Sequence, residues 1–138
     1  MSAYDGQTIY LGFYYSGNYA DEWYIDDVIV EDAPITPVMQ TLFSELTAPP
    51  TPIGTTVSDT FGILRNTGGG VLNVSSITLT NPDFAVDPTT AAVNPGDTLF
   101  VVGSFAPSTT GLITGLMIIS GDDPGNTSDT INVSGVGY

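Results

Sequence analysis

Residues 98–120, TLFVVGSFAPSTTGLITGLMIIS, determine the fold class of this chain. They contain two apolar runs, Thr98–Phe105 and Leu112–Ser120, which are rich in valine, isoleucine and phenylalanine. Side chains of these types are enriched in β-strands. The segment from Pro107 to Gly111 between the runs has the proline and glycine of a turn. The stretch therefore predicts two β-strands joined by a turn.

The residues on either side of this stretch repeat its pattern. Short β-branched runs alternate with segments that contain glycine, proline, asparagine or aspartate, and helix signals are almost missing. The further predicted strands are Val38–Leu46, Ser58–Asn66, Val71–Leu79, Phe84–Val86 and Asp129–Val136. Seven short strands at this spacing are typical of an immunoglobulin-like β-sandwich. We therefore expect an all-β fold, with the sandwich spanning residues 34–138.

The beginning of the chain predicts a separate aromatic β-hairpin. Thr8–Tyr15 and Trp23–Val30 have the composition of strands, with a turn around Ser16-Gly17-Asn18 between them. The segment from Glu31 to Pro34 then resembles a linker, so we expect the hairpin to comprise residues 1–33. A lone hairpin is marginally stable in water, and this one therefore requires a packing partner.

The charge balance limits the partners and the location of the protein. Fifteen acidic residues face a single base, Arg65, and the formal net charge is −14. Nucleic acid is excluded as a partner, because phosphate backbones are bound by basic patches. No run of about 20 apolar residues is present, so we expect no membrane span. A charge of this sign and size is found in extracellular and cell-surface proteins, in salt-adapted proteins and in proteins that bind cations, and composition does not choose among the three. Among these classes our expectation is an extracellular or cell-surface location.

The residue inventory argues against catalysis. The chain has no histidine, lysine or cysteine, which removes the usual general bases and activated nucleophiles. The Gly-x-Ser-x-Gly motif and the phosphate-binding loop are also missing, since Gly68-Gly69-Gly70 is not followed by Lys-Ser/Thr. We therefore predict that the protein is not an enzyme.

Residues 34–138 contain an ordered set of motifs that a known family shares. They are Leu64-Arg65-Asn66-Thr67-Gly68, Gly70-Val71-Leu72-Asn73-Val74, Asp83-Phe84, Asn94-Pro95-Gly96-Asp97, Phe105-Ala106-Pro107, Gly121-Asp122-Asp123-Pro124 and Ser134-Gly135-Val136-Gly137. In this order they resemble the ASPM-SPD-2-Hydin type of immunoglobulin-like module, which is also the repeat of bacterial choice-of-anchor D proteins. The resemblance implies a spacer or protein-binding platform without catalytic residues.

The first segment resembles a second family. Residues 17–28, GNYADEWYIDDV, are similar to the last two strands of a MAM-like or choice-of-anchor J jelly roll. The resemblance implies that residues 1–33 are the C-terminal remnant of such a domain, whose relatives include carbohydrate-binding sandwiches. A complete jelly roll needs more chain than these residues provide.

Acidic residues in this segment form the candidate metal site. Asp21, Asp26 and Asp27 supply the hard oxygen ligands that Ca²⁺ requires, and in similar sandwiches an aspartate of the Ile-Asp-Asp-Val motif ligates structural Ca²⁺. Because successive strand residues face opposite sides, Asp26 and Asp27 cannot both join one site. The alternative is that these acids are solvated or cap turns. A second acidic group, Asp122, Asp123 and Asp129, lies around a loop, and we interpret Asp122-Asp123-Pro124-Gly125-Asn126 as a turn rather than a metal site, because aspartate and asparagine cap their own backbone in turns.

Apolar side chains are expected on both faces of the predicted strands Thr98–Phe105 and Leu112–Ser120. Phe100 and Val102 point opposite to their buried neighbours in the first strand, as do Leu116 and Ile118 in the second. A two-sheet sandwich buries only one face of each sheet, so the second face requires a cover. The predicted interface residues are Tyr10, Phe13, Tyr14, Tyr15, Trp23, Tyr24, Phe100, Val102, Leu116 and Ile118.

These needs favour a role in assembly. Our hypothesis is that the hairpin packs on, or adds strands to, a sandwich, either its own or that of the next copy, and that the protein forms a fibre or surface assembly with copies of itself or other surface proteins. One alternative is a carbohydrate- or Ca²⁺-binding adhesion module, with glycans as partners. Another is a plain spacer in a modular surface protein.

Overall fold

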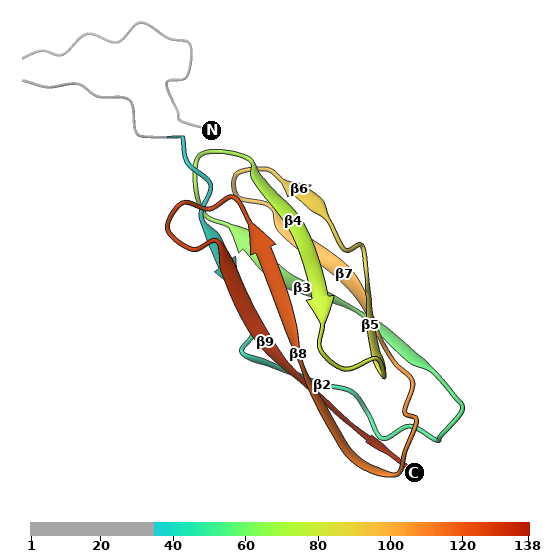
Figure 1. Ribbon diagram of the computed structural model, residues 1–138. Coiled ribbons are helices and arrows are strands. Elements are labelled where there is room, and N and C mark those ends of the chain that lie inside the picture. The colour runs from blue at the N-terminus through green and yellow to red at the C-terminus, as the bar shows by residue number, and fades with distance from the viewer. Residues whose placement is uncertain (1–34) are drawn as a thin grey trace, which may run out of the picture. The chain divides into compact units, whose positions relative to one another are not determined.

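The chain divides into two units, Met1–Ala33 and Pro34–Tyr138. The computed structural model describes residues 35–138 (Figure 1). These residues form two β-sheets with a common core and contain no α-helix. No helix in this range has the length and apolar character needed to cross a membrane. The predicted all-β, immunoglobulin-like sandwich is confirmed.

The strands lie in a four-stranded and a five-stranded sheet (Figure 1). Their bounds are β1 Met39–Thr41, β2 Glu45–Thr47, β3 Val57–Asn66, β4 Leu72–Leu79, β5 Phe84–Asp87, β6 Ala91–Val93, β7 Thr98–Phe105, β8 Gly111–Gly121 and β9 Ser128–Gly137. The four-stranded sheet has the order β1-β3-β7-β5, and the five-stranded sheet has the order β2-β9-β8-β4-β6. Neighbouring strands are antiparallel except β2 and β9, which are parallel.

Two parts of the predicted strand pattern were wrong. Val38–Leu46 is not one strand, because the chain leaves the four-stranded sheet after β1, passes through Leu42–Ser44 and joins the other sheet as β2. A run of suitable composition does not reveal that its two ends pair with different sheets. The short strand β6 was not predicted, because two of its three residues are alanines, which have low β-propensity.

The core lies between the sheets. In β7, Leu99, Val101 and Phe105 are buried, and the ring of Phe105 stacks on that of Phe84 with centroids 4.8 Å apart. Gly135 of β9 faces the same ring, and a Cβ placed there would lie 2.6 Å from Phe105 Cε1. Each large apolar side chain buried here stabilises the fold by about 1.5–3 kcal/mol.

Asn66 connects three segments at one end of this core. Its side chain is fully buried and makes four hydrogen bonds. Nδ2 donates to the carbonyl oxygens of Gly70 and Val93 at 2.6 and 2.9 Å. Oδ1 accepts from the backbone N–H groups of Val38 and Gly68 at 3.2 and 3.0 Å. Asn66 therefore holds together the start of the sandwich, the glycine turn and β6.

The glycine triplet after Asn66 allows a close backbone approach. A Cβ at Gly68 would lie 2.3 Å from the carbonyl oxygen of Thr36, and one at Gly70 would lie 2.3 Å from that of Ile35. The N–H groups of Gly69 and Gly70 both donate to the Thr36 carbonyl oxygen. The triplet thus serves packing, which agrees with the sequence argument against a phosphate-binding loop.

Candidate functional site

Exposed apolar side chains lie on the outer face of the four-stranded sheet. On β7, Phe100 is 62% exposed and Val102 is 43% exposed, and the two are adjacent on the same face of one strand. Phe100 is paired with Gly62 of β3, and a Cβ at Gly62 would lie 3.2 Å from the Phe100 ring. The ring therefore lies over the glycine, where no side chain separates it from the backbone.

A second group of apolar side chains lies on the outer face of the five-stranded sheet. Leu116 is 39% exposed and Ile118 is half-buried. Leu112 and Val136, which were not predicted as interface residues, face each other across β8 and β9 and are exposed. Leu112 and Leu116 are four residues apart and therefore lie on the same face of β8, so alternation alone could have predicted Leu112 as outward-facing. Its pairing with Val136 depends on the β8–β9 register, which the sequence does not show.

The four predicted interface residues in the described part of the chain do not form one surface. Phe100 and Val102 lie on one outer face, and Leu116 and Ile118 lie on the opposite one. The remaining predicted residues lie outside the described residues. They are Tyr10, Phe13, Tyr14, Tyr15, Trp23 and Tyr24 of the interface and Asp21, Asp26 and Asp27 of the Ca²⁺ site.

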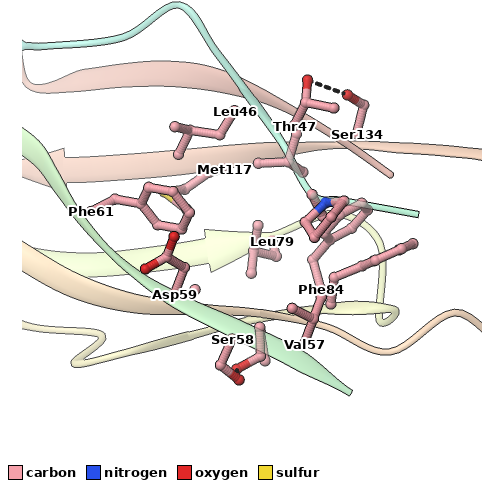
Figure 2. A pocket seen from close by; sticks show the side chains of 17 residues that line it. Leu46, Thr47, Val57, Ser58, Asp59, Phe61, Leu79, Phe84, Met117 and Ser134 are labelled. Carbon is pink, nitrogen blue, oxygen red and sulfur yellow. Dashed lines mark hydrogen bonds between the residues drawn. The ribbon is translucent and has the colours of Figure 1, made fainter. Parts of the chain in front are cut away.

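A groove that the sequence did not predict opens between the two sheets (Figure 2). It forms where the chain has left the edge of β3 and joined the other sheet as β2. Leu46 and Ala48 line one side, and Val57 and Phe61 line the other. Its empty volume is ≈ 500 Å³, including solvent at its mouth. The core residues Phe84, Phe105, Met117 and Val133 also line it, as does the partly buried Leu79.

The edge of β3 beside this groove has backbone groups without a neighbouring strand in the described residues. Strand β1 pairs with β3 only from Leu64 to Asn66, and the N–H of Leu42 donates to the Ile63 carbonyl oxygen. Further along β3, the N–H of Thr60 donates to the Asp59 carboxylate at 2.7 Å. Asp59 lies at the mouth of the groove (Figure 2) and, within residues 35–138, is the single ionisable side chain that lines it.

The acidic residues near the β8–β9 turn bond within the chain. The buried Asp123 carboxylate accepts the backbone N–H groups of Met39 and Gly125 at 2.7 and 2.8 Å, which joins the turn to β1. Asp122 accepts two hydrogen bonds from Asn73, and these hold the pKa of its carboxyl below the ordinary value. The predicted turn is confirmed. Within residues 35–138, no group of three or more acidic side chains is placed to hold a metal ion.

Comparison with known proteins identifies the described unit. The family model for the HYDIN/CFA65/VesB-like, Ig-like domain matches residues 44–136. A search of curated proteins gave no significant match. The match covers most of the described sandwich, including both outer faces, the groove and the edge of β3. The finer predicted resemblance, to the ASPM-SPD-2-Hydin and choice-of-anchor modules, stays a prediction.

Solved structures share the fold at low sequence identity. The ASH/PapD-like domain 7 of human CEP192 is 12% identical with a TM-score of 0.64, over 88% of this chain and 98% of that chain. A protein of unknown function from Porphyromonas gingivalis W83 is 24% identical with a TM-score of 0.61, over 77% of this chain and 49% of that one. The E. coli chaperone DraB is 11% identical with a TM-score of 0.52, over 71% of this chain and 54% of that chain. At these identities the likeness concerns the fold alone.

Proposed function

Because this chain belongs to the HYDIN/CFA65/VesB-like, Ig-like domain family, we propose that it is a non-catalytic structural module that self-associates outside the cell. The copies join through β-strand addition or hairpin packing and form a fibre or surface assembly. The observation that carries this proposal is the pair of adjacent exposed side chains, Phe100 and Val102, on the outer face of the four-stranded sheet.

An uncovered apolar pair of this kind favours an interface. Single exposed apolar residues are normal on protein surfaces, but contiguous ones mark sites of interaction. Phe100 and Val102 are adjacent on one strand, and Leu112 and Val136 are directly opposite each other on the other sheet. Two separate faces allow one copy to contact two neighbours, and such head-to-tail contacts generate open filaments.

The non-catalytic part of the proposal rests on the chemistry of the described residues. The groove is lined by apolar side chains, with Asp59 as its ionisable group. General acid–base catalysis by paired carboxylates needs two acids across a cleft. The chain also has no histidine, lysine or cysteine that could serve as a partner for Asp59.

Self-association can be tested by comparing the full chain with a variant that lacks residues 1–33. We expect the full chain to form oligomers that grow with salt concentration, because salt screens the repulsion between copies of charge −14. We expect the shortened chain to remain a monomer. Size-exclusion chromatography with light scattering at low and high salt measures both, and circular dichroism shows whether the sandwich persists.

Two results would count against the proposal in different ways. A full chain that stays monomeric at high salt and high concentration would refute self-association. A shortened chain that still assembles would show that residues 1–33 are not the connector and would leave the outer faces as the contact. The adhesion alternative, with glycan or Ca²⁺ binding through Trp23 or Asp26, rests on residues outside the described part and stays a prediction.

A further inference from the structure

We propose that the groove beside β3 receives an extended segment of a different protein. In this segment a lysine or arginine pairs with Asp59, and apolar side chains two residues before and two residues after the base enter the groove. The proposal concerns a heterologous partner and does not depend on self-association. It rests on the backbone edge of β3, the apolar lining of the groove and the charge at its mouth.

The backbone of β3 offers hydrogen-bonding groups to an added strand. Thr60 directs its N–H away from β7 and into the Asp59 carboxylate. Alternate residues of a strand direct their backbone groups to the same side, so Ser58 and Gly62 share this edge with Thr60. In the described residues, β1 ends its pairing with β3 at Leu64. A segment that adds to this edge gains directional main-chain hydrogen bonds, which supply affinity.

The position of the groove determines which side chains of the added strand enter it. Val57, Asp59 and Phe61 lie on one face of β3, since successive residues alternate between faces, and all three line the groove (Figure 2). Residues of the added strand that are opposite Val57 and Phe61 therefore point into the apolar space. The residue between them is opposite Asp59. The fitting pattern is apolar-x-base-x-apolar.

Charge selects a basic occupant. Residues 35–138 contain eight acids and one base. That base, Arg65, donates through Nε to the Gly96 carbonyl oxygen at 3.1 Å and lies on the part of β3 that β1 covers. Among the described residues that line the groove, Asp59 carries the charge, and no base lies among them. A carboxylate beside apolar walls attracts a base more strongly than one in bulk water does.

The same charge disfavours the two occupants that this chain could supply. If the β3 edges of two copies paired, the two Asp59 carboxylates would lie on adjacent strands, and like charges across strands are destabilising. The segment Thr8–Tyr15, TIYLGFYY, is apolar but contains no base for Asp59. Both remain outcomes that the experiment below can reveal.

Asp59 also controls access to the edge. Its carboxylate now occupies the N–H of Thr60, and acidic side chains on edge strands protect them against unspecific pairing. A base on the incoming segment competes for the carboxylate and releases the Thr60 N–H to the added strand. Segments without a base leave this N–H occupied. Binding of the base to Asp59 and release of the Thr60 N–H for the added strand therefore occur together.

Binding of short peptides to the full chain tests the proposal. The probes are capped peptides of sequence TVTKTVT and TVTETVT and a peptide of residues 8–15, each measured by isothermal titration calorimetry. We expect saturable binding of the lysine peptide and at least about tenfold weaker binding of the glutamate peptide, as for close charge pairs at interfaces. In Asp59→Lys the preference is expected to reverse. In Thr60→Pro, which removes the edge N–H, binding of the lysine peptide is expected to be lost, whereas Thr60→Val retains it.

Each other outcome overturns the proposal. If no peptide binds at millimolar concentration, the groove is not a strand-binding site. If the peptide of residues 8–15 binds more tightly than the lysine peptide, the occupant is this chain's own segment. If Asp59→Lys leaves the order of the two charged peptides unchanged, the base does not contact Asp59. Circular dichroism of each variant shows that the sandwich has folded, and Asp59→Lys decides the matter even if Thr60→Pro does not fold.

Discussion

Replacing Asn66 with alanine is expected to lower the free energy of unfolding by about 3 kcal/mol. The side chain is fully buried, and its removal leaves two N–H groups and two carbonyl oxygens without partners. Leaving a buried polar group unsatisfied costs about 1–3 kcal/mol, and some of these groups regain water near the surface. Urea unfolding followed by circular dichroism measures the loss.

Asn73→Ala is the matched control for Asn66→Ala. Asn73 is also an asparagine with a hydrogen-bonded side chain, but it is exposed, and its partner Asp122 can bond to water instead. We expect a loss of less than about 1 kcal/mol there. If Asn66→Ala lost no more than this control, Asn66 would not connect β1, the glycine turn and β6 in solution.

Gly135→Ala is expected to lower the free energy of unfolding by about 2 kcal/mol or more, although alanine suits a strand better than glycine does. The added Cβ would lie 2.6 Å from Phe105 Cε1 and 2.7 Å from Cζ. The Phe105 ring cannot move aside easily, because it is buried and stacked on Phe84. Thermal and urea unfolding measure the effect.

Gly125→Ala provides the comparison for this substitution. A Cβ at Gly125 would meet only Asp123 Oδ1 at 3.4 Å, which is ordinary contact, and the residue is exposed. We expect a change within about 0.5 kcal/mol. Equal stability of Gly135→Ala and the natural protein would mean that β9 and β7 are farther apart than the structure has them.

Local patterns predict most strands of this fold. Side chains that alternate between the two faces, bounded by turns with glycine or proline, predict strands such as Thr98–Phe105. Such a strand can be found locally, because its prediction requires only one buried face and two ends. Consecutive buried residues break the pattern at Ile63 and Leu64, where the register of β3 with β7 shifts at a bulge. The sequence predicts such a strand but not its irregularity.

The candidate site could be predicted only in part. Alternation identified Phe100, Val102, Leu116 and Ile118 as outward-facing, and the structure confirms that orientation. The groove has no sequence signal, because it exists only where β1 and β2 join different sheets. For the same reason the sequence does not distinguish Asp59 from other surface acids, because its position beside the open edge of β3 follows from the sheet topology.

The strongly acidic chain presents two surfaces of different chemistry. In the proposed assembly, apolar side chains on the outer faces contact other copies, and salt favours this contact because it screens the repulsion between them. The edge of β3 combines apolar space with Asp59 and selects a base instead. The two surfaces differ in chemistry, so variants can separate them. Phe100 and Val102 affect the first surface, and Asp59 and Thr60 affect the second.

Sedimentation velocity of the full chain carrying Phe100→Ser and Val102→Thr shows whether the outer face of β7 joins the copies. At high salt we expect the natural chain to sediment as oligomers and the double variant as a monomer. Ile53→Ser is the control, since Ile53 is 45% exposed but lies outside the strands of the four-stranded sheet, and it should leave the oligomers intact. An unchanged oligomer distribution in the double variant would show that the outer face of β7 is not the contact.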